Sequence, residues 1–184
     1  DGIGPLVDPM CGGGTFPIEA AWIATRRPPF FNREPSCLRW TWMRKDIREI
    51  WAFHMRRARN QILEDCPALI QGMDISGKAV AASHANAEAA GVAQHVEITQ
   101  GDARKLDVPQ GPGVFVCNPP YGERLDSKEK SQGLLEFFSE ELYGETGFVV
   151  AVPSPWEEVP EWMDMTPEKS IPMRKGKIPC TLHL

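Results

Sequence analysis

The chain has 184 residues, of which 42% are hydrophobic, so it fits one domain with a core of ordinary size. It contains no stretch of roughly 20 uninterrupted apolar residues and no basic-then-apolar leader, so we expect no membrane contact and a cytoplasmic location. The five cysteines form no C-x-x-C pair and the four histidines lack H-E-x-x-H spacing, which predicts reduced thiols and no bound metal.

The net charge of −5 is distributed unevenly along the chain. Residues 26–59 contain ten Lys and Arg against three acids, or +7, which leaves −12 for the other residues (−5 minus +7). Such a segment can meet a phosphate backbone, or it can be the solvated face of a basic helix whose Arg stems cover apolar surface. The sequence leaves both interpretations open.

The apolar runs alternate between short β-like segments and longer helical ones, which predicts an α/β fold with a parallel sheet. Strands are expected at residues 5–8, 69–74, 96–100, 114–118 and 147–152. Helices are expected at residues 16–25, roughly 42–64, 76–90 and about 128–142. An antiparallel hairpin at one edge of the sheet is expected from residues 169–173 and 178–183.

The segment between the first helix and the second strand is unusually long. Residues 26–41 contain three prolines and indicate a connector that leads into the basic helix, so we interpret residues 26–65 or thereabouts as an insertion. Asp74 consequently comes 60 residues after Gly14 (74 minus 14). In a plain nucleotide-binding βαβ unit, the acid at that strand end follows the glycine loop by about 20 residues.

The first candidate site motif is a strand that runs into a triple-glycine turn and then a helix, with the sequence LVDPMCGGGT over residues 6–15. Glycine adopts conformations barred to other residues, so such a turn exposes backbone N–H groups beside a helix N-terminus, where a carboxylate or phosphate can sit. It is not the G-x-G-x-x-G dinucleotide fingerprint, because the later glycine is missing. Taken alone, the motif can also be a simple tight turn.

Acidic residues follow the next two predicted strands. Asp74, in Gly72-Met73-Asp74-Ile75, is placed to accept both hydroxyls of a ribose, or to cap the next helix in competition with Ser76. Asp102, in Gly101-Asp102-Ala103, is placed to accept from an adenine amino group, or to form only a turn. A glycine loop and two acids at three successive strand ends together predict one adenosine-containing ligand across the carboxyl edge of the sheet.

The fourth predicted strand ends in Asn118-Pro119-Pro120-Tyr121 and continues as GERL. Two successive prolines fix φ and donate no N–H, so the Pro119 carbonyl can be held as a bare acceptor beside the Asn118 carboxamide oxygen. These two oxygens would hold both hydrogens of a planar –NH₂ and turn its lone pair towards an electrophile, while the Tyr121 ring stacks on the base. The tetrapeptide therefore predicts a site for an exocyclic base amine.

Together, D-P-x-C-G-x-G-T (8–15), G-x-D-I (72–75), G-D-A (101–103) and N-P-P-Y-G-E-R-L (118–125) resemble the class I methyltransferases. Over nearly its whole length, the chain is similar to the THUMP-associated large-subunit ribosomal RNA guanine-N2 methyltransferases. The resemblance implies a Rossmann-like α/β fold, with a seven-stranded, mostly parallel sheet in the order 3-2-1-4-5-7-6, an antiparallel last strand and helices on both faces. It also implies S-adenosyl-L-methionine as cofactor, S-adenosyl-L-homocysteine as product and ribosomal RNA as partner.

Carried over to this sequence, the resemblance assigns the methionine end of the cofactor to Asp8, Met10, Cys11, Gly12, Gly13 and Gly14. It assigns the ribose and adenine to Asp74 with Ile75 and to Asp102 with Ala103. The amine-binding catalytic loop becomes Asn118, Pro119, Pro120 and Tyr121, with Asn118 also against the cofactor. Glu123 and Arg124 match the extended motif without an assignable role. Gly13 stands where relatives commonly have Ser, which matters little in a loop that acts through its backbone.

The implied reaction transfers the sulfonium methyl to a base amine, specifically guanine N2 of 23S ribosomal RNA. Because N-P-P-Y serves any planar amine, N6 methylation of adenine in DNA, guanine-N2 methylation of transfer RNA and N5 methylation of a protein glutamine stay open. The intact tetrapeptide argues against a non-catalytic nucleotide- or RNA-binding module, and the missing third glycine argues against a nicotinamide-dependent oxidoreductase.

Residues 1–184 are expected to form one methyltransferase domain that carries the basic insertion. Asp1 lies just before the first predicted strand, so the THUMP module and the helix that usually precedes this strand are expected to be absent. RNA affinity is accordingly expected to depend on that missing module.

Overall fold

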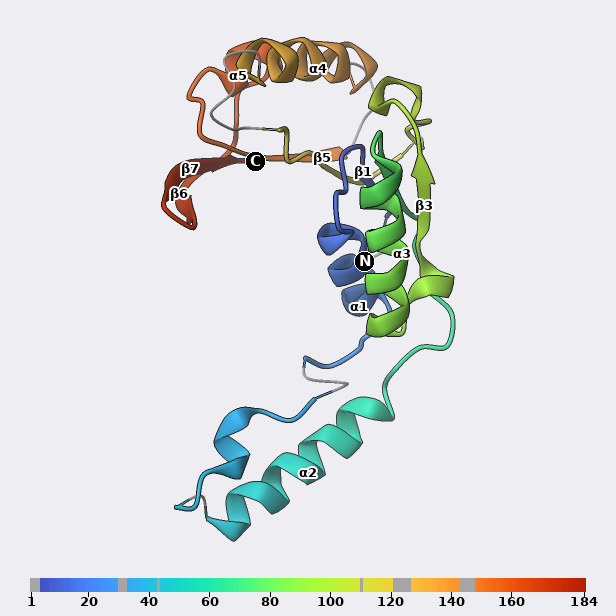
Figure 1. Cartoon of the computed structure of the whole chain (residues 1–184), viewed down its shortest axis with the longest axis vertical. Helices are drawn as coiled ribbons and strands as arrows, with labels where there is room; N and C mark the ends of the chain where they lie inside the picture. Colours follow the sequence, from blue (N-terminus) through green and yellow to red (C-terminus); the bar gives the residue numbers. More distant parts are fainter. Residues whose placement is uncertain (1–3, 30–32, 43, 110, 121–126, 143–147) are drawn as a thin grey trace.

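The computed structural model of the protein describes residues 4–29, 33–42, 44–109, 111–120, 127–142 and 148–184. Its strands form one seven-stranded sheet in the order β3-β2-β1-β4-β5-β7-β6 (Figure 1). The strands are β1 (Leu6–Asp8), β2 (Ile70–Asp74), β3 (Glu97–Gln100), β4 (Gly113–Val116), β5 (Phe148–Ser154), β6 (Ser170–Lys175) and β7 (Ile178–His183). From β3 to β5 all neighbours pair in parallel, whereas β7 runs antiparallel to both β5 and β6. The predicted strand order and antiparallel last strand are confirmed.

Helices cover both faces of the sheet, as expected. The helices are α1 (Thr15–Ala24), α2 (Lys45–Arg59), α3 (Gly77–Ala90), α4 (Ser127–Leu142) and α5 (Val159–Trp162), with 3₁₀ turns η1 (Ser36–Arg39), η2 (Ala93–His95) and η3 (Ala103–Lys105). Figure 1 shows α1 and α3 on one side of the sheet and α4 and α5 on the other. Ser76 caps α3, because its hydroxyl accepts a hydrogen bond from the Ala79 amide at 3.3 Å.

The insertion is less helical than the sequence predicts, because α2 covers 15 residues rather than the whole of residues 42–64. Before α2 the rings of Trp40 and Trp42 pack on each other, and after it the chain turns back so that the Leu63 amide donates to the Thr25 carbonyl at 2.9 Å. This bond closes the base of a loop of residues 26–62, which we call the arm. In Figure 1 the arm extends away from the sheet, with α2 at one end of the molecule.

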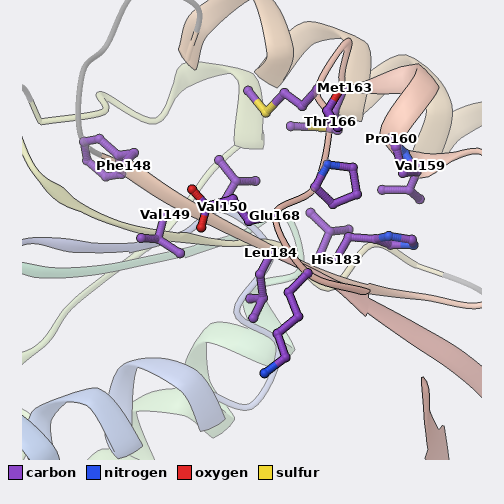
Figure 2. Close-up of a pocket in the computed structure, with 14 residues that line it drawn as sticks. Phe148, Val149, Val150, Val159, Pro160, Met163, Thr166, Glu168, His183 and Leu184 are labelled. Atoms are coloured by element: carbon purple, nitrogen blue, oxygen red, sulfur yellow. The ribbon is translucent and has the colours of Figure 1, made fainter. Parts of the chain in front are cut away.

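A cavity of about 490 Å³ opens along the first residues of β5 (Figure 2). Val150 from β5 and Val159 and Met163 from the α5 region contribute to its largely apolar wall, and His183 lies beside them. Burial lowers the pKa of His183, so its imidazole is neutral at pH 7. None of the residues assigned from the motifs lines this cavity, and it is therefore separate from the predicted cofactor site.

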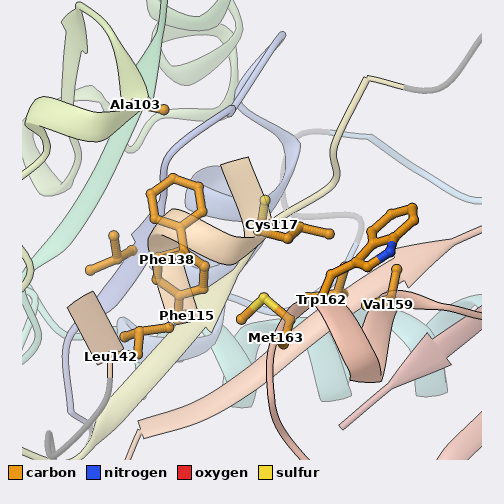
Figure 3. Close-up of a cluster of buried hydrophobic side chains, with 11 residues drawn as sticks. Ala103, Phe115, Cys117, Phe138, Leu142, Val159, Trp162 and Met163 are labelled. Carbon is orange, nitrogen blue, oxygen red and sulfur yellow. The ribbon is translucent and has the colours of Figure 1, made fainter. Parts of the chain in front are cut away.

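The main hydrophobic core lies between the sheet and α4 (Figure 3). Phe115 of β4 and Phe138 of α4 are both buried, with ring centroids 5.0 Å apart in an edge-to-face arrangement. Such a pair contributes about 0.5–1.5 kcal/mol beyond the burial of its area. Cys117, which directly precedes Asn118, is fully buried in the same cluster. The backbone that enters the predicted amine site is thus fixed by the core.

Candidate functional site

The glycine turn connects β1 to α1 and is fastened to the end of β2. Gly12 and Gly14 have φ angles of 55° and 80°, a region that glycine enters without steric cost. The Cys11 amide donates to the Met73 carbonyl at 2.8 Å, the Gly12 amide to Asp74 Oδ2 at 3.0 Å, and the Gly14 amide to the Cys11 carbonyl at 2.8 Å. Three of the amides expected to be exposed are therefore already bonded, as buried backbone groups generally are.

The space around the turn is closed on one side and open on the other. A Cβ atom at Gly14 would lie 2.1 Å from Ser83 Oγ of α3, and Asn86 of the same helix donates from Nδ2 to the Gly13 carbonyl at 2.9 Å. A Cβ atom at Gly12 would meet nothing within 4 Å. The turn thus packs tightly on α3, and its free side lies at Gly12, where a ligand has room.

Asp8 is a fully buried carboxyl group at the end of β1. Its Oδ1 atom accepts from the Met10 amide at 3.1 Å, whereas Oδ2 has no hydrogen-bond partner among the described residues. Burial, opposed by the Met10 bond and reinforced by the charge of Asp74, raises the pKa of Asp8 to about 7. A buried oxygen without a partner costs free energy, so a cationic group placed here would stabilise the carboxylate.

The acid at the end of β2 bridges the glycine turn and the start of α3. Asp74 accepts the Gly12 amide through Oδ2 and the Ser76 amide through Oδ1, at 3.0 and 2.8 Å. It does not cap α3, since that role belongs to the Ser76 hydroxyl. Each carboxylate oxygen keeps a second lone pair, so Asp74 can still accept hydroxyl groups. The neighbouring Ile75 side chain is 74% exposed and offers apolar surface at the same edge.

The acid after β3 is engaged locally. Asp102 Oδ1 accepts from the Arg104 amide at 3.0 Å, and Oδ2 lies 3.5 Å from the Arg104 guanidinium. In this arrangement Asp102 caps η3, whose first residue, Ala103, is buried. The Gly101 amide donates to the Asp74 carbonyl at 3.0 Å, which holds this turn against the end of β2. The two acids therefore lie at adjacent strand ends, as the motifs predict.

The tetrapeptide follows β4 and is anchored on its far side by α4. Asn118 Oδ1 is buried and has no hydrogen-bond partner among the described residues. The Pro120 carbonyl accepts from the fully buried Ser131 hydroxyl at 3.0 Å, and Pro119 is also buried. Tyr121, together with Glu123 and Arg124, lies outside the described residues. The acceptor half of the predicted amine site is described, and its aromatic half is not.

Asp8 and Asn118 stand at the ends of neighbouring parallel strands. The Leu6–Val114 and Val7–Phe115 pairs set the register between β1 and β4. Burial and the charge of Asp8 raise the pKa of the thiol of Cys117, which directly precedes Asn118. Burial and the charge of Asp8 likewise raise the pKa of Cys11 to about 11. Both thiols are thus protonated at neutral pH and are poor nucleophiles.

Three polar side chains that support the site were not singled out from the sequence: Ser83, Asn86 and Ser131. Ser83 and Asn86 stand three positions apart in an otherwise Ala-rich helix, so their shared face was a usable signal. Ser131 carries no comparable signal, because its partner is 11 residues away across a loop. Across the described part of the chain, no three His, Cys, Asp or Glu side chains group as a metal site requires.

None of the described helices is both long and apolar enough to cross a membrane.

Curated relatives and solved structures match almost the whole chain. The "Ribosomal RNA large subunit methyltransferase K/L" of Aliivibrio fischeri is 32% identical in an alignment 184 positions long, which covers 96% of this chain and 26% of that protein. The structure of SMU.472, assigned as a methyltransferase and solved with SAH, matches with a TM-score of 0.85 and 26% identity over 98% of this chain and 47% of that one. The structure of a predicted N6-adenine-specific DNA methylase from Listeria monocytogenes matches with a TM-score of 0.82 and 30% identity over 97% of this chain and 45% of that one.

This chain therefore spans about a quarter of the length of the curated relatives it matches. The sheet order agrees with the fold that the resemblance to methyltransferases implies. The family described as "RMKL-like, methyltransferase domain" matches residues 2–183, and the chain belongs to that family.

Proposed function

We propose that the chain transfers the methyl group of S-adenosylmethionine to an exocyclic base amine in RNA, namely guanine N2 of large-subunit ribosomal RNA. The observation that carries the proposal is a pair of buried oxygens, Asp8 Oδ2 and Asn118 Oδ1, at the ends of β1 and β4, for which no described residue supplies a hydrogen-bond partner. The first suits a cationic ligand and the second suits an N–H donor. The name of the Aliivibrio fischeri relative and its 32% sequence identity to this chain support ribosomal RNA as the substrate.

The residues around the glycine turn fit this cofactor. S-adenosylmethionine supplies an electrophilic methyl group on a positively charged sulfur and also carries an amino group. Asp8 would hold the positively charged methionine end, for which the open side of Gly12 leaves room. Asp74 accepts the ribose hydroxyls through its remaining lone pairs, with Ile75 offering apolar surface beside it. Asp102 accepts from the adenine amine once it turns from Arg104.

The tetrapeptide orients the acceptor amine. Asn118 Oδ1 and the Pro119 carbonyl accept its two hydrogens and direct the lone pair at the methyl group. Ser131 holds the Pro120 carbonyl, so these acceptors are fixed before the substrate arrives, which lowers the barrier through alignment and preorganised dipoles. No strong base is needed, because the amine loses a proton readily once methylated and cationic. A paired target base must first be extruded, at a cost of a few kcal/mol.

The test supplies methyl-labelled cofactor with large-subunit ribosomal RNA, transfer RNA and genomic DNA in parallel. We expect the label in large-subunit ribosomal RNA, as N2-methylguanosine after nuclease digestion and mass spectrometry. Label found only as N6-methyladenine in DNA would refute the assignment. The Asn118→Ala variant is the matched control: we expect at least a hundredfold loss of transfer with little change in S-adenosylhomocysteine affinity, because this oxygen acts on the amine.

A further inference from the structure

The arm leaves the molecule at the edge of the sheet opposite the predicted amine site. α1 starts at the glycine turn and runs back to the amino edge, and β2 begins at that edge. The arm connects these two ends, and the Leu63–Thr25 hydrogen bond closes it there. Asn118 follows the carboxyl end of β4. Figure 1 shows α2 well separated from the sheet, so the arm does not line the predicted amine site.

The exposed surface of the arm combines positive charge with aromatic rings. Its ten Lys and Arg against three acids make it +7. Trp40 and Trp42 are 48% and 70% exposed, with ring centroids 4.9 Å apart. Exposed Arg56 and Arg57 lie in the last turn of α2. Leu38 and Met55 are buried within the arm, whereas Ile47, Ile50 and Phe53 of α2 are 42–55% exposed, so apolar and aromatic surface beside the arginines is available to a partner.

The charge and the aromatic rings fit a single-stranded or irregular RNA better than a protein. A polyanion complements the +7 charge, and exposed indole rings offer surfaces on which unpaired bases stack. The buried centre of a protein interface is depleted in charged residues, whereas these rings are interspersed with arginines. We propose that the arm is a second RNA-binding surface, remote from the methylated base, on which Trp42 stacks a base and Arg56 and Arg57 contact phosphates. This inference rests on the proposed function.

The position of the arm makes its effect dependent on RNA length. An RNA that reaches both sites must run past the length of β2, five residues or ~17 Å, and then along part of α2, 15 residues or ~22 Å. A strand of five nucleotides centred on the target base extends about 7 Å to either side when stacked, so it occupies the predicted amine site without reaching the arm. The arm therefore raises the affinity for long RNA and leaves the chemical step unchanged.

The experiment compares three variants on two RNAs. The variants are Trp42→Ala, the double variant Arg56→Gln with Arg57→Gln, and the control Lys169→Glu. The control lies outside the arm and changes the net charge by −2, as the double variant does. The RNAs are transcribed large-subunit ribosomal RNA and a 5-nucleotide strand centred on the methylated guanine. For the long RNA we expect Trp42→Ala to raise KM about tenfold at unchanged kcat. We expect the arginine pair to reduce the slope of log affinity against log salt by about 1.4–1.8.

On the 5-nucleotide strand all variants should match wild type, and Lys169→Glu should do so on both RNAs. An unchanged KM and salt slope for the long RNA would overturn the inference, as would equal losses on both RNAs. Sedimentation showing a wild-type dimer that Trp42→Ala dissociates, without a change in RNA affinity, would instead assign the arm to self-association. Because RNA binding is measured without cofactor, arm-dependent binding without methyl transfer would overturn the proposed function and not the arm.

Discussion

The buried carboxyl group of Asp8 makes a prediction that separates stability from ligand binding. Its pKa is about 7 in the folded protein and 3.8 in an ordinary environment. The folded state therefore binds the proton more tightly than the unfolded state between these values. By linkage, the free energy of unfolding falls as the pH rises through this window, and the loss is complete above about pH 7.

The size of this effect follows from the two pKa values. A difference of about 3 units corresponds to about 4 kcal/mol at high pH, of which about 2.5 kcal/mol accrues between pH 5 and pH 8. Asp8→Asn keeps an Oδ1 atom for the Met10 amide and removes the titration. Its new –NH₂ group lacks a partner, which costs about 1–3 kcal/mol independently of pH. The prediction therefore concerns how the difference in free energy of unfolding between the two proteins changes with pH.

Urea unfolding of wild type and Asp8→Asn at pH 5, 6, 7 and 8 measures this slope. We expect the variant to gain about 2.5 kcal/mol relative to wild type across the series. Contributions from all other groups are common to both proteins and cancel in the comparison. In calorimetry, S-adenosylmethionine should bind wild type more weakly as the pH falls below about 7, and should bind the variant weakly at every pH. If the difference in free energy of unfolding between the two proteins stays constant from pH 5 to pH 8, Asp8 ionises normally and is not buried as described.

Other substitutions test the turn and the tetrapeptide. Gly12→Ala should cost about 1–2 kcal/mol of stability, from its left-handed backbone alone, yet block S-adenosylhomocysteine binding in calorimetry. Gly14→Ala should cost about 2–5 kcal/mol in urea unfolding, because its Cβ atom also meets Ser83. Ser131→Ala should lower kcat about five- to tenfold at unchanged S-adenosylhomocysteine affinity. Its control on the same helix, Ser139→Ala, loses a bond to the Met163 carbonyl and should lower stability by about 1 kcal/mol at unchanged kcat. Equal kcat values for the two serine variants would contradict a positioning role for Ser131.

The sequence predicts the sheet, and which side chains lie at its carboxyl edge, because both depend on local signals. Each strand is a short apolar run ended by Gly, Pro, Asp or Asn, and every predicted strand agrees with the structure within two residues at either end. In a parallel sheet the carboxyl ends of the strands lie at one edge, so Asp8, Asp74 and Asn118 are brought to the same edge.

Features that depend on contacts between distant residues could not be predicted in this way. The Gly12–Asp74 bond joins residues 62 positions apart and uses an amide that the glycine motif alone indicates to be exposed. Ser83 limits Gly14 because of how closely α3 approaches α1, which the Ala-rich composition predicts only in general terms. For the arm, periodicity and charge predict a basic helix, but they do not specify how far it stands from the sheet.

The two edges of the sheet have different constraints, and this explains why the chain can carry a large arm. At the carboxyl edge, a glycine without room for a methyl group and two buried oxygens leave little freedom for change. At the amino edge, a 37-residue loop, 26–62, is closed by a backbone hydrogen bond between Thr25 and Leu63 that requires no particular side chain. Substitutions in the arm therefore leave the strand ends in place, so RNA affinity can change there without disturbing the chemistry. We therefore expect substitutions in the arm to change KM and substitutions at the strand ends to change kcat.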